Sequence, residues 1–90
     1  MLKILEDLIL LARDRKKIPI PGSYTNKILS DKYLSQEKVL EEVGELIEAV
    51  EKNSNKIHEA ADVFYHLIMY IEANEIKIED IMDELQKRKK

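Results

Sequence analysis

Leucine and isoleucine recur every three or four residues at the start of the chain, at Leu2, Leu5, Leu8 and Ile9. This period is typical of a helix with one apolar face, and similar patterns recur further along the chain. The predicted helices cover residues 2–16, 36–52, 56–73 and 79–89, with a short helical turn at 27–32. Proline and glycine at positions 19–22 interrupt the pattern, and residues 53–55 form a second turn. The chain is therefore predicted to be all-α, a bundle of four or five helices.

The helix predicted over residues 36–52 separates apolar from acidic positions. Ser35 is its expected N-cap. Its expected core stripe consists of Val39, Leu40, Val43, Leu46, Ile47 and Val50. At about 100° per residue, Glu42 and Glu45 lie together on one side, away from the centre of that stripe. For this helix alone, an acidic face in contact with solvent is the simpler interpretation.

The helix predicted over residues 56–73 is apolar or aromatic around almost its whole circumference, which predicts burial on more than one side and favours a dimer. Asn74 is expected to end it in the left-handed conformation. Between His58 and residue 71, its only charged or imidazole side chains are Glu59, Asp62 and His66, on one face. Carboxylates in apolar surroundings need compensation, which either a basic side chain or a divalent metal ion supplies.

A metal ion explains the acids of both helices at once. A short turn makes the two helices antiparallel, so that Glu42 and Glu45 can face Glu59 and Asp62. Four carboxylates offer the oxygen ligands that Mg²⁺ or Mn²⁺ prefers. The sequence has no glycine-rich phosphate loop, so such a cluster would hold phosphate groups instead. His66 is either a partly buried, hydrogen-bonded histidine or a partner of these acids, and His58 is expected at the surface.

Length and composition indicate one domain, residues 1–90, without cysteine and with a net charge of −3. This charge argues against a nucleic-acid partner. Glu6 and Asp7 interrupt the apolar N-terminus, and no apolar run is long enough to span a membrane, so we expect a cytoplasmic protein. A basic run from Arg13 to Lys17 allows two interpretations: complementing a helix dipole or binding phosphate.

The segments Glu41–Leu46 and Glu59–Asp62 resemble the MazG-like all-α nucleotide pyrophosphohydrolases. The resemblance to the phosphoribosyl-ATP pyrophosphatase family is closer still, and it covers roughly residues 5–88. The segments that carry it are Asp14–Lys16, Pro21–Thr25 with Leu29, Lys38–Val39 and Glu59–Leu67. The Ser-Tyr-Thr and Glu-Ala-Ala-Asp…Tyr-His segments are specific when they occur together.

This resemblance implies a homodimeric MazG-like bundle that depends on Mg²⁺. Its substrate would be phosphoribosyl-ATP, cleaved between the α and β phosphates to phosphoribosyl-AMP and pyrophosphate in the second step of histidine biosynthesis. The implied metal ligands are Glu42, Glu45, Glu59 and Asp62, with Glu41 and Glu42 as the catalytic acids. The implied substrate contacts are Arg15, Ser23, Tyr24, Thr25 and Lys38.

Two alternatives stay open. The first is a MazG-like pyrophosphohydrolase of free NTPs or dNTPs, to which Gly44-Glu45-Leu46 is closer. The second is a non-catalytic helical dimerisation module. The loop over residues 23–25 argues against the first, since a general nucleotide hydrolase has no evident need for it. The acids on the otherwise apolar helix over 56–73 argue against the second.

Overall fold

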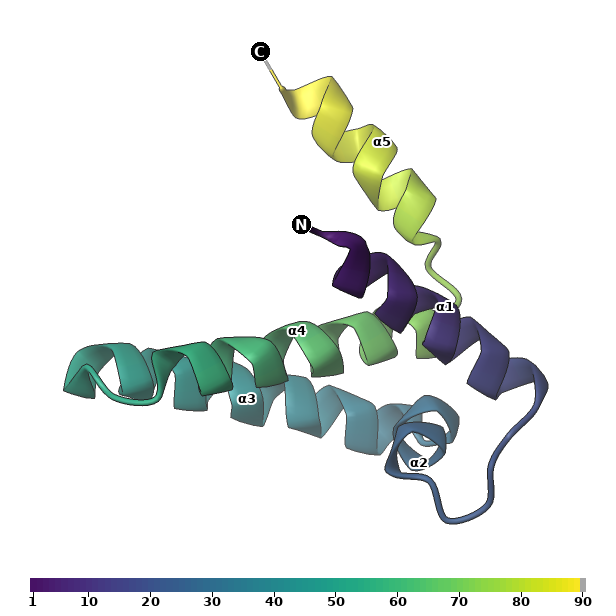
Figure 1. The fold of residues 1–90 in the computed structure, drawn as a ribbon, viewed down its shortest axis with the longest axis horizontal. Coiled ribbons are helices and arrows are strands. Elements are labelled where there is room, and N and C mark those ends of the chain that lie inside the picture. Colours follow the sequence, from purple (N-terminus) through teal and green to yellow (C-terminus); the bar gives the residue numbers. More distant parts are fainter. Residues whose placement is uncertain (90) are drawn as a thin grey trace.

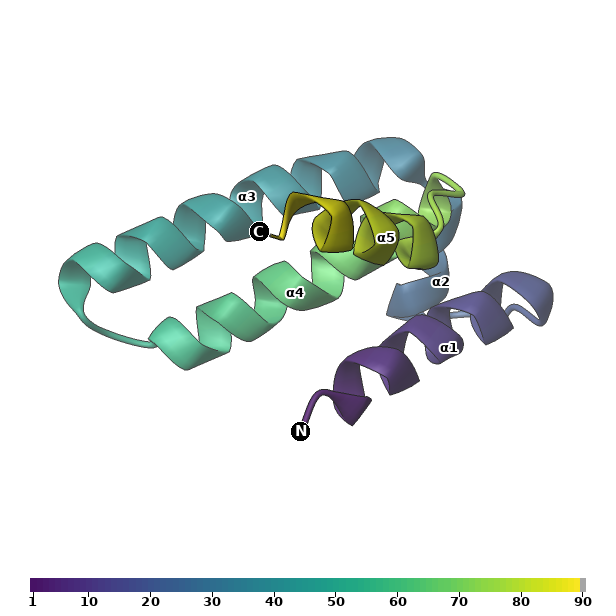
Figure 2. The same ribbon diagram turned by 90° about the horizontal axis from the view of Figure 1, so that it is seen from above.

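The computed structural model describes residues 1–89, which form five α-helices and no β-strand. The helices are α1 (Lys3–Lys17), α2 (Tyr24–Ser30), α3 (Lys32–Lys52), α4 (Lys56–Ala73) and α5 (Ile78–Arg88). Helices α3 and α4 form a long antiparallel hairpin, and α1 and α2 pack at one end of it (Figures 1 and 2). The expected all-α class is confirmed; Lys90, the last residue of the expected domain, lies outside the described residues. Among residues 1–89, no helix is both long and apolar enough to cross a lipid bilayer.

The predicted bounds hold for α4 and shift by one residue for α1 and α5, whereas α2 and α3 begin earlier than predicted. Ser35 is not the N-cap of α3. Asp31 has that role, and its side chain accepts a hydrogen bond from the backbone N–H of Leu34 at 3.0 Å. Ser23 similarly caps α2, with the N–H of Asn26 at 3.3 Å. The two helices therefore begin three and four residues before the predicted starts at residues 27 and 36.

The α3–α4 turn is made by asparagines in the left-handed region, Asn53 at φ 51° and Asn55 at φ 57°. Asparagine tolerates this conformation better than most residues, so the sequence is well suited to a tight hairpin. The prediction for the other end of α4 was wrong by one residue. Asn74 has φ −96°, and it is Glu75 that adopts the left-handed conformation, at φ 57°.

The core lies where α1, α2 and α4 meet, and it is small. Its buried apolar residues are Ala12, Ile28, Leu29, Met69 and Ala73. Three partly buried side chains, those of Leu8, Leu34 and Tyr65, pack against them. This core holds α2, and with it the loop that precedes α2, against the side of α4.

The predicted core stripe of α3 was wrong for the single chain. Leu40, Ile47 and Val50 are 69%, 55% and 57% exposed. The face of α3 that is buried carries Glu42 and Ala49 instead, and α3 packs mainly on α4. Hydrophobic periodicity identifies an apolar stripe, but it does not identify which surface covers that stripe. Helix α4 is likewise open on one side, where Phe64 is 54% exposed.

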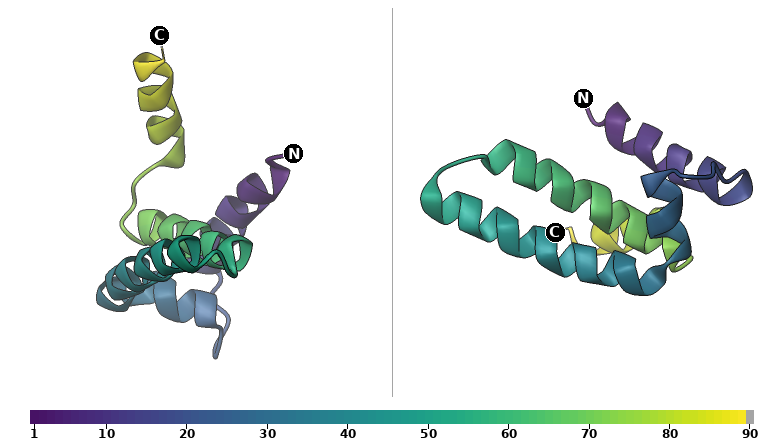
Figure 3. Two further views of the ribbon diagram at one scale, coloured as in Figure 1. Left: turned by 90° about the vertical axis from the view of Figure 1, so that its left-hand side faces the viewer. Right: turned by 90° about the horizontal axis from the view of Figure 1, so that it is seen from below.

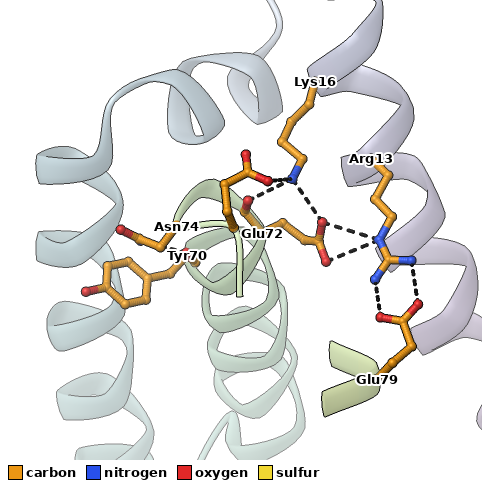
Figure 4. Close-up of polar contacts among 7 residues, drawn as sticks. Arg13, Lys16, Tyr70, Glu72, Asn74 and Glu79 are labelled. Carbon is orange, nitrogen blue, oxygen red and sulfur yellow. Dashed lines mark hydrogen bonds and ion pairs between the residues drawn. The ribbon is translucent and has the colours of Figure 1, made fainter. Parts of the chain in front are cut away.

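Helix α5 projects away from the hairpin (Figures 1 and 3) and is tied to α1 through ion pairs. The guanidinium of Arg13 donates two hydrogen bonds to Glu79, at 2.9 and 2.7 Å, and contacts Glu72 of α4 at 3.4 Å (Figure 4). Lys16 donates to the backbone oxygen of Glu72 at 2.8 Å. The hydrogen bond from Arg13 holds the pKa of Glu79 at about 2, so this ion pair persists into acid.

Candidate metal and substrate site

Three carboxylates meet between α3 and the first turn of α4. One oxygen each from Glu42, Glu45 and Glu59 lie within 4.8 Å of one another. Glu59 also belongs to a second such group, with Asp62 and the imidazole of His58. Residues three apart on a helix share a face, which is why each helix supplies a pair of acids to the same place. We call Glu42, Glu45, Glu59 and Asp62 the acidic cluster.

The acidic cluster is short of positive charge. Within residues 1–89, no lysine or arginine forms a salt bridge with any of its four members, and His58 contacts Asp62 at 3.4 Å. Glu42 is only 8% exposed, and its Oε2 has no hydrogen-bond partner among the described residues. Oε2 of Glu59 is also buried and likewise has no hydrogen-bond partner among the described residues. Buried carboxylate oxygens without partners are costly, and a bound cation is a compensation that suits them.

Electrostatics shift the proton equilibria of the acidic cluster. Burial raises the pKa of Glu42 to about 7, helped by a hydrogen bond shared with Glu45 and by the negative charges around it. Burial, followed by the charge of Glu45, also raises the pKa of Glu59. Without a cation, the cluster therefore retains a proton at a pH where an ordinary glutamate has lost it.

The residues present fit a hard divalent cation. All four members of the acidic cluster are oxygen donors, and two of them carry the orphaned oxygens described above. Mg²⁺ or Mn²⁺ suits such a set better than a metal that prefers nitrogen or sulfur. The assignment of these side chains as metal ligands stays a prediction.

Glu41 and Lys38 lie beside the acidic cluster on α3. Lys38 Nζ is 3.2 Å from Glu41 Oε2. The hydrogen bond and the charge of Glu41 raise the pKa of Lys38, so this ammonium is fully charged at neutral pH. The pair thus places one exposed acid and one fixed positive charge next to the buried Glu42.

The start of α2 is held by three hydroxyl side chains, those of its N-cap Ser23 and of its first two residues, Tyr24 and Thr25. Ser23 Oγ accepts from Arg15 Nη1 at 2.8 Å, and Thr25 Oγ1 is 2.6 Å from the Tyr65 hydroxyl. The Tyr24 hydroxyl lies 2.9 Å from Nε2 of His66. The predicted substrate residues 23–25 are thus held against α1 and α4.

Asn26 was missed by the sequence analysis. Its Oδ1 accepts from the N–H of Ile20 at 2.9 Å, and its Nδ2 donates to the carbonyl of Arg15 at 2.9 Å. The side chain therefore closes the turn between α1 and α2. An asparagine shortly after a proline-glycine pair is a signal for such a turn.

The basic run at the end of α1 serves two different contacts. Arg15 turns toward Ser23, whereas Arg13 and Lys16 bind Glu72, Glu75 and Glu79 (Figure 4). The ion pairs of Arg13 and Lys16 join α1 to α4 and α5, a role that neither interpretation predicted. Lys16 also lies in the last turn of α1, where a cation complements the helix dipole. Glu72, only 3% exposed, was missed as their partner. The sequence signal that could have identified Glu72 is that it is an acid within the apolar C-terminal part of α4.

His66 is a buried, hydrogen-bonded histidine, 6% exposed, as the first of its two interpretations predicted. Its Nδ1 lies 2.9 Å from the backbone oxygen of Asp62. His58 is at the surface, as expected.

The family model described as phosphoribosyl-ATP pyrophosphohydrolase matches residues 5–89. No solved structure matches the chain.

Curated relatives agree with the family model. The phosphoribosyl-ATP pyrophosphatase of Clostridium acetobutylicum is 46% identical over 96% of this chain and 81% of its own length. The phosphoribosyl-ATP pyrophosphatase of Methanocella arvoryzae is 35% identical over the full length of both chains. The histidine biosynthesis bifunctional protein HisIE of Pyrococcus furiosus is 37% identical over 99% of this chain, which spans only 43% of that longer protein. The chain therefore belongs to the phosphoribosyl-ATP pyrophosphohydrolase family, and with it to the hydrolases of histidine biosynthesis.

Proposed function

We propose that this enzyme acts in the cytoplasm and hydrolyses phosphoribosyl-ATP to phosphoribosyl-AMP and pyrophosphate, with Mg²⁺ held by Glu42, Glu45, Glu59 and Asp62. The observation that carries the metal assignment is the acidic cluster itself. Its carboxylates form two groups that share Glu59, two of their oxygens are buried without a hydrogen-bond partner, and no lysine or arginine within residues 1–89 pairs with them. The family match supports the substrate.

Different residues of the site would have different roles in hydrolysis. A divalent ion bound at the acidic cluster would neutralise phosphate charge and favour attack by water. In this proposal Glu41, which is exposed and 3.2 Å from Lys38, would accept a proton from that water, and Lys38 would add positive charge toward the phosphates. Glu42 is itself a member of the cluster, and it is the second catalytic acid of the proposal because it is buried on α3 next to Glu41.

Arg15 and the hydroxyls of residues 23–25 would bind the nucleotide outside the cluster. A guanidinium has five N–H donors, and the structure commits one of Arg15's nitrogens to Ser23. The rest of the fork suits a phosphate group. An extra phosphate distinguishes phosphoribosyl-ATP from a free nucleotide, so Arg15 is a candidate for binding that phosphate.

Replacing Arg15 with alanine is therefore expected to lower kcat/KM for phosphoribosyl-ATP about tenfold, as one charge-assisted contact is lost. The rate on dATP should change much less. The measurement is the ratio of kcat/KM for the two substrates in the parent and the variant, with Lys17→Ala as the matched control at the end of α1. An unchanged ratio would remove Arg15 from substrate recognition, and a parent ratio near one would favour a general nucleotide hydrolase.

We also propose that the enzyme is a homodimer in which a second copy covers the exposed stripe of α3. Leu40, Ile47 and Val50 are each more than half exposed, which is unusual for a row of large apolar side chains on one helix. A two-fold contact would bury the same row from both copies.

The dimer proposal predicts that Ile47→Lys weakens self-association. Losing the burial of half an isoleucine from each copy costs roughly 2 kcal/mol per dimer, about thirtyfold in the dissociation constant. Sedimentation velocity across micromolar concentrations measures it. Leu85→Lys, on α5 and 52% exposed, is the control and should leave the constant unchanged. A parent chain that sediments as a monomer at tens of micromolar would contradict the proposal.

A further inference from the structure

The hydrogen-bond direction between Tyr24 and His66 follows from the other ring nitrogen. His66 Nδ1 lies 2.9 Å from the backbone oxygen of Asp62, and a carbonyl oxygen only accepts hydrogen bonds. Nδ1 must therefore carry the hydrogen. In the neutral imidazole Nε2 is then an acceptor, so the Tyr24 hydroxyl, 2.9 Å away, donates its hydrogen to it.

This direction limits what Tyr24 can offer to a ligand. Its single hydrogen is committed to His66, which leaves only lone pairs on the phenolic oxygen. A phosphate anion also presents only lone pairs, so the two oxygens would repel one another. A hydroxyl or N–H group, in contrast, can donate to Tyr24.

Packing keeps the arrangement in place. His66 is 6% exposed, and the Tyr65 ring meets it edge-on with centroids 5.0 Å apart. The Tyr24 ring stacks on Tyr65 at 6.4 Å. Because the imidazole is enclosed on α4, it cannot turn over easily and exchange its two nitrogens.

Tyr24 is also in reach of a ligand at the acidic cluster. It is 47% exposed, and it lies near the charges of Lys38, Glu41 and Glu42. Burial raises its pKa, against the opposing charge of Lys38, so the phenol keeps its hydrogen at neutral pH.

We propose that His66 is a positioning residue that makes the Tyr24 oxygen a hydrogen-bond acceptor, through which the enzyme reads a donor group of its nucleotide substrate. The donor is a ribose hydroxyl or the exocyclic nitrogen of the adenine ring, and phosphate contacts are left to Arg15 and Lys38. This inference rests on the proposed function for the identity of the substrate. The direction of the Tyr24–His66 bond does not depend on it.

The first test measures the tautomer of His66 directly. Long-range ¹H–¹⁵N NMR at pH 8 distinguishes a histidine protonated on Nδ1 from one protonated on Nε2. The chain has only two histidines, so a His58→Gln variant assigns the spectrum. We expect the hydrogen of His66 on Nδ1. A hydrogen on Nε2, or on both nitrogens, would overturn the proposal, because Tyr24 would then be free to donate.

The second test compares substrates. Tyr24→Phe and His66→Phe are each expected to lower kcat/KM for phosphoribosyl-ATP by about tenfold, and the double variant by no more than either. His66→Gln keeps an acceptor for Tyr24 and should restore part of the loss. Tyr65→Phe, the matched control, removes the neighbouring hydroxyl that holds Thr25.

Substrate analogues then identify the donor. One set lacks single ribose hydroxyls, and another analogue has oxygen in place of the exocyclic nitrogen. The effect of Tyr24→Phe and of His66→Phe should vanish on one analogue, whereas the effect of Tyr65→Phe should be the same on all. An effect of Tyr24→Phe that persists on every analogue would overturn the proposal, as would losses that add in the double variant. A parent enzyme that does not hydrolyse phosphoribosyl-ATP itself would overturn the proposed function, and NMR would still decide the hydrogen-bond direction.

Discussion

Replacing Glu59 with glutamine is expected to abolish hydrolysis while leaving the fold intact. Glu59 belongs to both groups of potential metal ligands, and its Oε2 has no hydrogen-bond partner within residues 1–89. Glutamine keeps the size of the side chain and removes its charge. Transition-state stabilisation by a metal ion is worth several kcal/mol, so the loss in kcat should be roughly a thousandfold.

The fold should survive this change because the charge removed is an unfavourable one. Burial and then the charge of Glu45 raise the pKa of Glu59, so a neutral side chain relieves both penalties in the metal-free protein. The measurements are kcat with Mg²⁺ and thermal unfolding with a chelator present. Glu51→Gln is the matched control, since nine residues from Glu42 place it half a turn away on α3. Activity of Glu59→Gln within about threefold of the parent would contradict the metal assignment.

The metal-free protein is expected to lose stability as pH rises from 5 to 8. Glu42 has a pKa of about 7 in the folded state, against 4.5 for an ordinary glutamate such as that of the unfolded chain. Between those values the folded protein keeps a proton that the unfolded chain has released, so the free energy of unfolding falls with rising pH. A shift of this size corresponds to roughly 3 kcal/mol.

Urea unfolding with a chelator, at fixed protein concentration, measures this effect. Glu42→Gln should abolish most of the pH dependence and be more stable than the parent at pH 8. Added Mg²⁺ should stabilise the parent at pH 8 and much less at pH 5, where binding must displace the proton. Equal pH dependence in the parent and in Glu42→Gln would show that Glu42 does not retain the proton.

Helices and local spacing could be predicted from the sequence because both depend on neighbours a few residues apart. The 3.6-residue period located α1, α4 and α5 within one residue. The same local geometry, with a short turn, predicted that acids spaced three apart on two helices would meet. The structure does bring Glu42, Glu45 and Glu59 together.

Contacts between distant residues could not be predicted in this way. Tyr24 and His66 are separated by 42 positions in the sequence, and Arg13 and Glu79 by 66. Nothing in either local pattern specifies its partner. The prediction that the apolar stripe of α3 lies in the core failed for a related reason. An apolar row such as Leu40, Ile47 and Val50 is equally consistent with a core and with a surface that another molecule covers.

The most direct test of the proposed function is to follow phosphoribosyl-ATP by ³¹P NMR in the presence of the enzyme and Mg²⁺. Cleavage between the α and β phosphates should yield phosphoribosyl-AMP and pyrophosphate in equal amounts, and the reaction should stop when a chelator is added. Release of inorganic phosphate with a nucleoside diphosphate product, or the same rate with the chelator present, would contradict the proposed reaction and its dependence on the acidic cluster.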